Sequence, residues 1–284
     1  MNGSRPDPPP GPLLVVGRGR LGRGLARRAR EAGLEVRLTS GRAPSAGAVR
    51  RARIVLLAVP DPAIEPTAER IAALLRPGIV VLHAAGRLGT EPLGSCARAG
   101  AAVGVLHPLV SFADPAHPPS LEGSCFVAWG SPEALRRARP LVEALGARWV
   151  RRPAPPGPAY HAAAALLANG AVALAHGADR VFEGLGFRPW QRRAALASLL
   201  RTVADNLERM DPPAALSGPA RRGDAEAVGA HLAALDAGTP ETAATYRRVL
   251  PAIVACARAA GLSAAAARRL LADRARDERQ SSPA

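Results

Sequence analysis

The stretch VVGRGRLGRGLARRA, from Val15 to Ala29, decides the fold. It carries the glycine spacing G-x-G-x-x-G at Gly17, Gly19 and Gly22, after an apolar run and before an amphipathic one. In a strand–turn–helix unit these glycines permit a tight turn, approach of the backbone to a pyrophosphate, and close packing of helix on strand. The alternative is a glycine turn without a ligand. We predict a phosphate-binding loop whose N–H groups face the anion, formed by Gly17, Arg18, Gly19, Arg20, Leu21 and Gly22.

Short apolar runs and amphipathic stretches alternate along the first half of the chain. The apolar runs predict strands at 13–16, 34–39, 54–59, 79–84, 101–107 and 124–129, with helices at 21–32 and 64–75 among those between them. Apolar strands separated by helices are typical of a parallel sheet covered on both faces. We therefore predict an α/β domain with a doubly wound parallel sheet over residues 13–152, after a disordered tail at 1–12.

The proline-rich segment VRRPAPPGPAY, residues 150–160, ends this alternation. Downstream, Ala, Leu and Arg recur at helical spacing, and Gly, Pro, Asp or Ser residues mark helix ends at 186–189, 211–213, 238–240 and 261–263. We predict an all-helical domain over 153–279 and a tail at 280–284. The apolar run AYHAAAALLANGAVALAHGA contains two histidines and an asparagine, so we expect a buried helix of a soluble protein and not a membrane span.

Composition narrows the classes of partner. All 38 basic side chains are arginine, and the formal net charge is +15. The arginines are spread among acidic residues and aromatic residues make up only 3%, so the sequence lacks a basic arm or stacking platform for nucleic acid. The three cysteines lie far apart without metal-ligand spacing. We expect a cytoplasmic protein with no nucleic-acid, membrane or metal partner.

The segment EVRLTSGRA, residues 35–43, bears on the choice of dinucleotide. An NAD-binding domain usually carries Asp or Glu after its second strand to bind the ribose 2′-hydroxyl. This segment has Thr39, Ser40 and Arg42 instead, and a hydroxyl with a guanidinium suits a 2′-phosphate. Arg42 could equally be one surface arginine of an arginine-rich chain. We predict NADP as cofactor, with Ser40 and Arg42 as contacts.

Several motifs in order carry a family resemblance: VVGRGRLG, IVLLAVPDPAI, VLHAAGRLG, VGVLHPLVSFADP, YHAAAALLANGAVAL and ALSGPARRGDAEAVGAHL. The chain resembles oxidoreductases that join a Rossmann-like NADP-binding domain to a helical C-terminal domain of unknown function. These are similar to ketopantoate reductases, pyrroline-5-carboxylate reductases and prephenate dehydrogenases. The resemblance implies a C-terminal domain like that of 6-phosphogluconate dehydrogenase, and further cofactor contacts at Val59, Pro60, His83 and Gly86.

Two departures from the family pattern bear on catalysis. Ala85 stands where the family often carries a hydroxyl near the nicotinamide ring. The chain also has no lysine, the residue that ketopantoate reductases use as catalytic acid. Histidine is then the obvious proton carrier near neutral pH. His107 follows the fifth strand, at the edge where ligands bind, and resembles the His-Pro motif of prephenate dehydrogenases; the alternative is a structural loop histidine.

Further candidates come from the helical half. His161 and Asn169 are eight residues apart, so both can lie on one helix face and contact substrate. We also predict substrate contacts at Ser111, Ser217, Arg222 and Asp224, with Arg222 holding a carboxylate. Asp224 could instead be the N-cap of the following helix.

Together these observations predict an NADPH-dependent reductase of a C=O or C=N bond in a small anionic metabolite, with 2-dehydropantoate as the best single substrate. A prephenate or arogenate type of dehydrogenase and a non-catalytic NADP-binding sensor are the alternatives. The long alanine-rich helix also predicts a homodimer packed through the second domain.

Overall fold

The computed structural model describes residues 11–272. The chain divides into two compact units, Met1–Ala168 and Asn169–Ala284. The division falls inside a long helix, whereas the sequence places the boundary at 152/153, before this helix begins. Residues 1–10 of the predicted N-terminal tail, and the segment 273–284 with the predicted C-terminal tail, lie outside the described residues.

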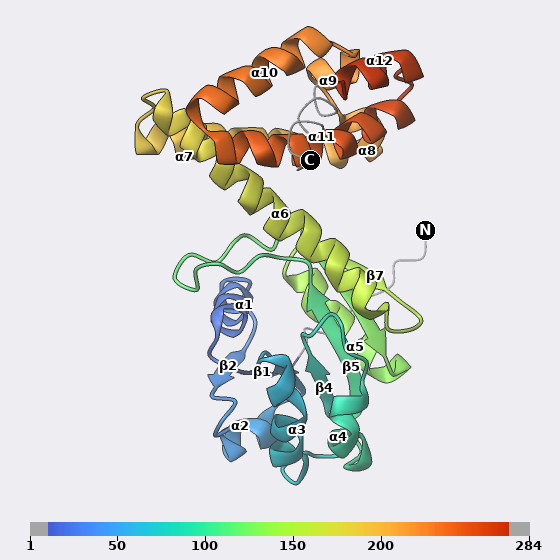
Figure 1. The fold of residues 1–284 in the computed structure, drawn as a ribbon. Helices are drawn as coiled ribbons and strands as arrows, with labels where there is room; N and C mark the ends of the chain where they lie inside the picture. The colour runs from blue at the N-terminus through green and yellow to red at the C-terminus, as the bar shows by residue number, and fades with distance from the viewer. Residues whose placement is uncertain (1–10, 273–284) are drawn as a thin grey trace, which may run out of the picture. The chain divides into compact units, whose positions relative to one another are not determined.

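A seven-stranded sheet forms the centre of the first unit (Figure 1). The strands are β1 (Leu13–Val16), β2 (Val36–Thr39), β3 (Ile54–Leu57), β4 (Val80–His83), β5 (Ala102–Pro108), β6 (Cys125–Gly130) and β7 (Arg148–Arg151). Their order is β2-β1-β3-β4-β5-β6-β7. Because β1 pairs in parallel with β2 on one side and β3 on the other, the strand order reverses beside β1. This is the position where open α/β sheets bind ligands.

The sheet differs from the prediction at its far edge. The predicted strand at 124–129 exists as β6, but it runs antiparallel to β5, with His107 opposite Val127. The chain then returns through a helix to β7, which pairs in parallel with β6. The sequence RWVR of β7 contains no apolar run, so it gives no signal for a strand. In the structure both arginines and Val150 are exposed on this edge of the sheet.

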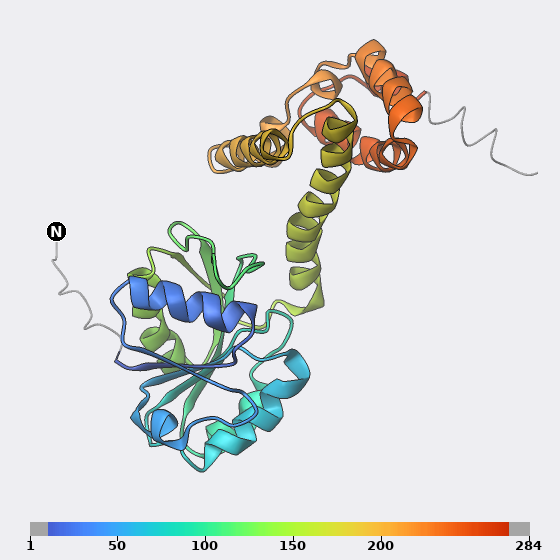
Figure 2. The same cartoon turned by 90° about the vertical axis from the view of Figure 1, so that its left-hand side faces the viewer.

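Helices cover both faces of the sheet, as Figure 2 shows, so the doubly wound α/β architecture is confirmed. The helices of this unit are α1 (Arg20–Glu31), α2 (Ala46–Arg51), α3 (Ile64–Ala72), α4 (Gly94–Arg98) and α5 (Pro132–Ala144), with short 3-10 helices η1 (Asp61–Ala63) and η2 (Glu91–Leu93). Buried side chains of α1 and α5 pack on one face, and those of α2, α3 and α4 pack on the other. Alternate residues of β1, β3 and β4 supply the two cores, as burial on both sides requires.

The second unit is helical, as predicted. It includes the C-terminal half of α6 (Gly157–Gly184) and the helices α7 (Pro189–Leu207), α8 (Pro212–Ala215), α9 (Pro219–Arg222), α10 (Ala225–Gly238), α11 (Pro240–Ala259) and α12 (Ala264–Leu270). The four predicted stop signals lie at the α6–α7, α7–α8, α10–α11 and α11–α12 boundaries. A buried cluster of its own joins α9, α10, α11 and α12, with Leu232, Leu250 and Val254 among its members.

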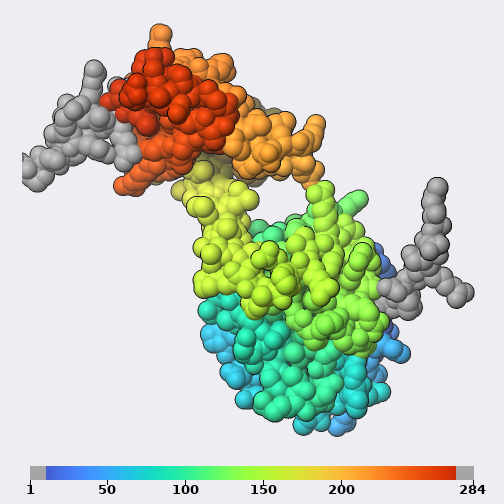
Figure 3. Space-filling model, turned by 90° about the vertical axis from the view of Figure 1, so that its right-hand side faces the viewer, coloured from blue at the N-terminus to red at the C-terminus, as the bar shows by residue number. Residues whose placement is uncertain are grey.

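The prediction that the apolar run at 159–178 is a buried helix is wrong in one respect. The run is helical, but neither α6 nor α7 has a buried residue. The cause is that the core of the second unit forms from α9 to α12 alone, and the surface of α6 is directly visible in yellow-green in Figure 3. By length and composition α6 is the one helix among the described residues that could cross a membrane, with a mean hydropathy of 1.2.

Candidate functional site

The glycine loop connects β1 to α1 at the carboxyl edge of the sheet. Gly17 has φ +129°, and a Cβ there would lie 2.1 Å from the carbonyl oxygen of Ala58 at the end of β3. A Cβ on Gly22 would lie 2.0 Å from the carbonyl oxygen of Gly17. Both positions therefore require glycine: Gly17 for the turn and its contact with β3, Gly22 for the packing of α1 on the loop.

Gly19 differs from its two neighbours. It is the N-cap of α1 with an ordinary backbone conformation, φ −71° and ψ −175°, and no side chain caps the helix. A Cβ there would meet nothing within 4 Å. The exposed N-terminus of α1 therefore lies beside open space, which fits a pyrophosphate approaching the first N–H groups of the helix. Arg18 and Arg20 are exposed on either side.

The segment after β2 lies beside the loop after β3. A Cβ on Gly41 would lie 2.5 Å from Cγ1 of Val59, and Pro60 follows at the same edge. The Arg42 N–H donates to Ser40 Oγ at 3.2 Å, which fixes the turn and leaves the Arg42 side chain exposed. Arg70 of α3 reaches the same turn, donating to the Gly41 carbonyl at 3.0 Å.

Arg70 was not among the predicted contacts. It brings a second guanidinium to the turn where a 2′-phosphate is expected. The α3 sequence gives no sign of this contact, because it depends on how α3 packs beside a loop far away in the chain.

A pocket of about 270 Å³ opens at the carboxyl ends of β1, β4 and β5. It joins the glycine loop to the predicted catalytic histidine, since its lining residues are Arg20, Leu21, Ala84, His107, Pro108, Val110 and Phe112. Ser111, the predicted substrate contact, is exposed in the loop that leaves this pocket. The two strongest sequence motifs thus line one cavity.

His107 contacts Tyr160, a residue that no sequence motif singles out. Its Nδ1 lies 2.7 Å from the hydroxyl of Tyr160 in the first turns of α6. The His161 ring stands edge-on at a centroid distance of 6.2 Å. A Cβ on Gly86 would lie 2.8 Å from His107 Nε2, so glycine is needed at Gly86 to make room for the ring. Tyr160 also stands edge-on to Trp129, which positions its hydroxyl.

Both partners of the His107–Tyr160 contact are neutral at physiological pH. Burial, with a further contribution from the neighbouring His161, lowers the pKa of His107 to about 4, although Asp61 acts in the opposite direction. Burial raises the pKa of Tyr160 to about 12. A neutral imidazole has one N–H donor and one acceptor nitrogen, so His107 can accept from Tyr160 at Nδ1 and donate from Nε2.

His83 lies at the end of β4, and both of its ring nitrogens are used within the following turn. Its side chain is fully buried; Nδ1 accepts from the Ala85 N–H at 3.2 Å, and Nε2 lies 2.7 Å from the Gly89 carbonyl oxygen. Burial lowers its pKa, so the ring is neutral and Nε2–H donates to Gly89. With both nitrogens engaged, His83 holds the turn that contains Ala85 and Gly86, and a cofactor contact at His83 stays a prediction.

The remaining candidates belong to α6 and the second unit. His161 and Asn169 are exposed on α6. Ser217 and Arg222 are exposed around α9. Asp224 accepts a hydrogen bond from the Ala227 N–H at 3.0 Å and is the N-cap of α10, the alternative that its sequence left open. Substrate contacts at Asn169, Ser217 and Arg222 stay predictions.

Two family models match the chain. A Rossmann-like domain matches residues 23–108, and a domain of unknown function, DUF2520, matches residues 124–253. The second match begins at the strand β6 and continues through the helical region to α11. No curated protein matches the sequence.

Solved structures share the fold at low sequence identity. A Bacteroides fragilis protein provisionally named an NADP oxidoreductase has a TM-score of 0.66 at 18% identity, over 86% of this chain and 98% of its own. The Thermotoga maritima protein TM1727 has a TM-score of 0.59 at 23% identity, over 87% and 98%. Plasmodium falciparum pyrroline carboxylate reductase, solved with NADP bound, has a TM-score of 0.59 at 12% identity, over 92% and 97%. The chain is thus similar to a Rossmann-like domain over residues 23–108 and to DUF2520 over residues 124–253, and it shares its fold with these structures.

Proposed function

We propose that the protein is an NADP(H)-dependent oxidoreductase that reduces a C=O or C=N bond of a small anionic metabolite. The observation that carries the proposal is the single pocket lined both by Arg20 and Leu21 of the glycine loop and by His107. A nicotinamide, when bound, supplies the hydride, so the protein needs only to orient the substrate and to stabilise or protonate the developing negative charge. Neutral side chains with aligned hydrogen-bond donors can stabilise or protonate this charge.

The His107–Tyr160 pair supports a specific arrangement of protons. With the Tyr160 hydroxyl donating to Nδ1 over 2.7 Å, the neutral imidazole carries its proton on Nε2. No residue within 11–272 takes a hydrogen bond from Nε2, so this N–H is free to donate to the substrate's oxygen or nitrogen. When Nε2 gives up its proton, Tyr160 can pass its own proton to Nδ1, and the resulting tyrosinate takes up a proton from water before the next turnover. This relay does not need the lysine that the chain lacks.

The pocket also bears on the class of substrate. A volume of about 270 Å³ suits a small metabolite, and Arg20 supplies a positive charge at its wall. Phe112 is the one aromatic ring in the lining besides that of His107, which gives a ring-shaped substrate little to stack on. These features favour a small oxo acid or imino acid, and the sequence resemblance makes 2-dehydropantoate the first compound to test.

NADPH oxidation by the purified protein, followed against a panel of small oxo acids, cyclic imino acids and prephenate, tests the proposal. We expect turnover with an anionic oxo or imino acid. Turnover with prephenate in the oxidative direction alone would favour the dehydrogenase alternative. Tight NADPH binding without turnover on any compound would favour the sensor.

The preference for NADPH over NADH should reside in Arg42 and Arg70. Removing both guanidinium groups in Arg42→Ala/Arg70→Ala should weaken NADPH binding by at least about a hundredfold, the scale of two lost charge-assisted contacts, while NADH binding barely changes. Dissociation constants for both cofactors measure this. Arg37→Ala, which removes an exposed arginine from β2, is the matched control. Equal weakening of NADPH and NADH would rule out the 2′-phosphate reading.

We further propose that a second copy of this chain covers α6 and α7. Large apolar side chains of both helices are exposed, among them Leu166 at 78%, Leu167 at 70% and Leu199 at 59%. From 162 to 178 α6 carries no Asp, Glu or Arg, so a partner in a two-fold dimer would meet an equally uncharged surface. An uncovered apolar surface of this extent is typical of a protein interface.

A charge in the middle of this surface should break the dimer. Wild-type protein, whose chain mass is 29.3 kDa, should have twice that mass by light scattering, and Leu166→Asp should be monomeric. Ala230→Asp places the same charge on the exposed surface of α10 and should remain a dimer. A monomeric wild type, or a wild type that partitions into lipid vesicles through α6, would contradict the proposal.

A further inference from the structure

A second cavity lies at the opposite edge of the sheet from the glycine loop. Its volume is about 470 Å³, and it is lined by Pro12, Arg50, Arg51, Ala52, Arg53, Arg76, Pro77, Gly78, Ile79 and Arg137. Pro12, Arg53 and Ile79 immediately precede β1, β3 and β4. The cavity is therefore at the amino ends of these strands, whereas the cofactor loop is at their carboxyl ends, about 13 Å away along a four-residue strand.

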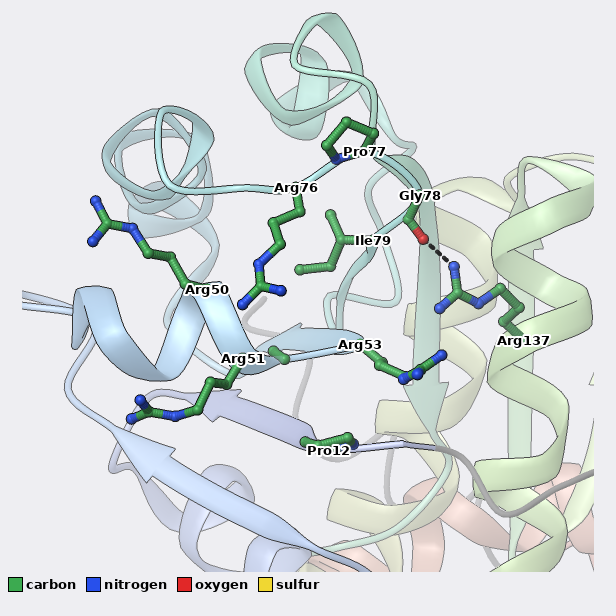
Figure 4. Close-up of a pocket in the computed structure, with 10 residues that line it drawn as sticks. Pro12, Arg50, Arg51, Arg53, Arg76, Pro77, Gly78, Ile79 and Arg137 are labelled. Carbon is green, nitrogen blue, oxygen red and sulfur yellow. Dashed lines mark hydrogen bonds between the residues drawn. The ribbon is translucent and has the colours of Figure 1, made fainter.

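Five arginines from three segments (50–53, 76 and 137) line this cavity, and no acidic residue does. Figure 4 shows the guanidinium groups of Arg53 and Arg137 pointing toward one another and Arg76 running alongside Ile79. Arg50 and Arg51, at the end of α2, point outward in the same view. We therefore take Arg53, Arg76 and Arg137 as the inner group and the α2 pair as its rim.

Few acidic side chains of the protein neutralise the charges of the inner arginines. Arg137 donates to the Gly78 carbonyl oxygen and lies 3.9 Å from Glu133, whose carboxylate is already held by Arg136 at 2.6 Å. Arg53 and Arg76 have no acidic partner within residues 11–272. Arginines keep their charge at all physiological pH values, so the group stays positively charged. The arrangement is favourable when an anion neutralises the group.

We propose that this cavity binds an anion with linked phosphate groups, such as an inorganic polyphosphate or the phosphate chain of a nucleotide. Guanidinium groups bind phosphate oxygens through paired N–H donors. Several guanidinium groups around a cavity of about 470 Å³ match an anion with more than one phosphate better than a single phosphate ion. Binding here is independent of the proposed dinucleotide site at the opposite edge.

Calorimetric titration with inorganic tripolyphosphate at physiological salt tests the proposal. Wild type should bind it saturably and more tightly than orthophosphate. Binding should weaken at least about tenfold in Arg53→Gln/Arg137→Gln and in Arg76→Gln, since each lost charge-assisted contact is worth about that much. Arg98→Gln, which removes one exposed charge of the same unit outside the cavity, is the control and should bind like wild type. Melting curves confirm that each variant is folded.

Two further titrations identify which anion is recognised and where on the protein it binds. Titration with ATP distinguishes recognition of the phosphate chain alone, with an affinity equal to that of tripolyphosphate, from recognition of a whole nucleotide, with a higher affinity. Tripolyphosphate binding should persist in Gly19→Val, in which the dinucleotide loop is blocked. Loss of binding in Gly19→Val, equal weakening in Arg98→Gln, or no saturable binding to wild type would overturn the proposal.

Discussion

Gly19→Val should abolish binding of both NADP and NAD while the protein stays folded. The Gly19 backbone has φ −71°, which valine adopts, and a Cβ there meets nothing within 4 Å. The added side chain would occupy the space through which a pyrophosphate must approach the N-terminus of α1. We expect the dissociation constants of both dinucleotides to rise about a hundredfold or more, equivalent to at least roughly 2.7 kcal/mol. Titration calorimetry measures the loss, and thermal melting shows that the fold is kept.

Two further variants serve as comparisons for Gly19→Val. Arg23→Val puts the same side chain on the exposed surface of α1, one turn further on, and should bind both dinucleotides like wild type. Gly17→Val should fail to fold properly, since its Cβ would lie 2.1 Å from the Ala58 carbonyl oxygen at a φ of +129°. Unchanged dinucleotide affinity in Gly19→Val would mean that the glycine loop is a structural turn.

The second large effect is expected at His107. His107→Ala should lower kcat about 10²-fold or more, the usual scale of general acid catalysis, with the NADPH dissociation constant nearly unchanged. Tyr160→Phe keeps the ring that packs edge-on to Trp129 and removes only the hydroxyl that contacts Nδ1. It should lower kcat in the same direction by a smaller factor, because the Nε2 donor remains but loses its relay partner. Steady-state kinetics on the substrate found in the panel measure both variants.

The pH dependence and a control separate a catalytic from a structural role. Since the pKa of His107 is lowered to about 4 and that of Tyr160 is raised to about 12, neither should titrate in the neutral range. The kcat of the wild type should therefore show no step from this pair at neutral pH. His117→Ala, in an exposed loop, should leave kcat unchanged. Parallel loss of NADPH affinity and kcat in His107→Ala would make the residue structural.

Sequence patterns predict the strands and turns whose burial or geometry depends on residues that are neighbours in the chain. The predicted runs became β1 to β6, and the glycine spacing became the β1–α1 turn, because strand burial and a tight turn each leave a direct mark on sequence. The strand β7 leaves no such mark, since its exposed edge position demands no apolar run. The antiparallel direction of β6 is likewise invisible, because it depends on the long connection that follows Pro108.

Some residues of the candidate site are predicted by sequence motifs, and others are not. Gly17, Gly22 and His107 could be selected from motifs, and they lie where those motifs predict. The contact between His107 and Tyr160 joins residues 53 positions apart, and the contact of Arg70 with Gly41 joins residues 29 positions apart, so neither has a signal in local spacing. His83 was placed correctly at the end of β4, but only the structure shows that both of its nitrogens are used within the turn.

Titration of the wild-type protein with NADPH and with NADH tests the central claim most directly. The account predicts one dinucleotide bound per chain, with NADPH binding at least about tenfold more tightly than NADH because two guanidinium groups lie at the turn after β2. Saturable NADPH binding that Gly19→Val abolishes would place it at the glycine loop. Absence of saturable binding of either dinucleotide to the folded wild type would contradict the account.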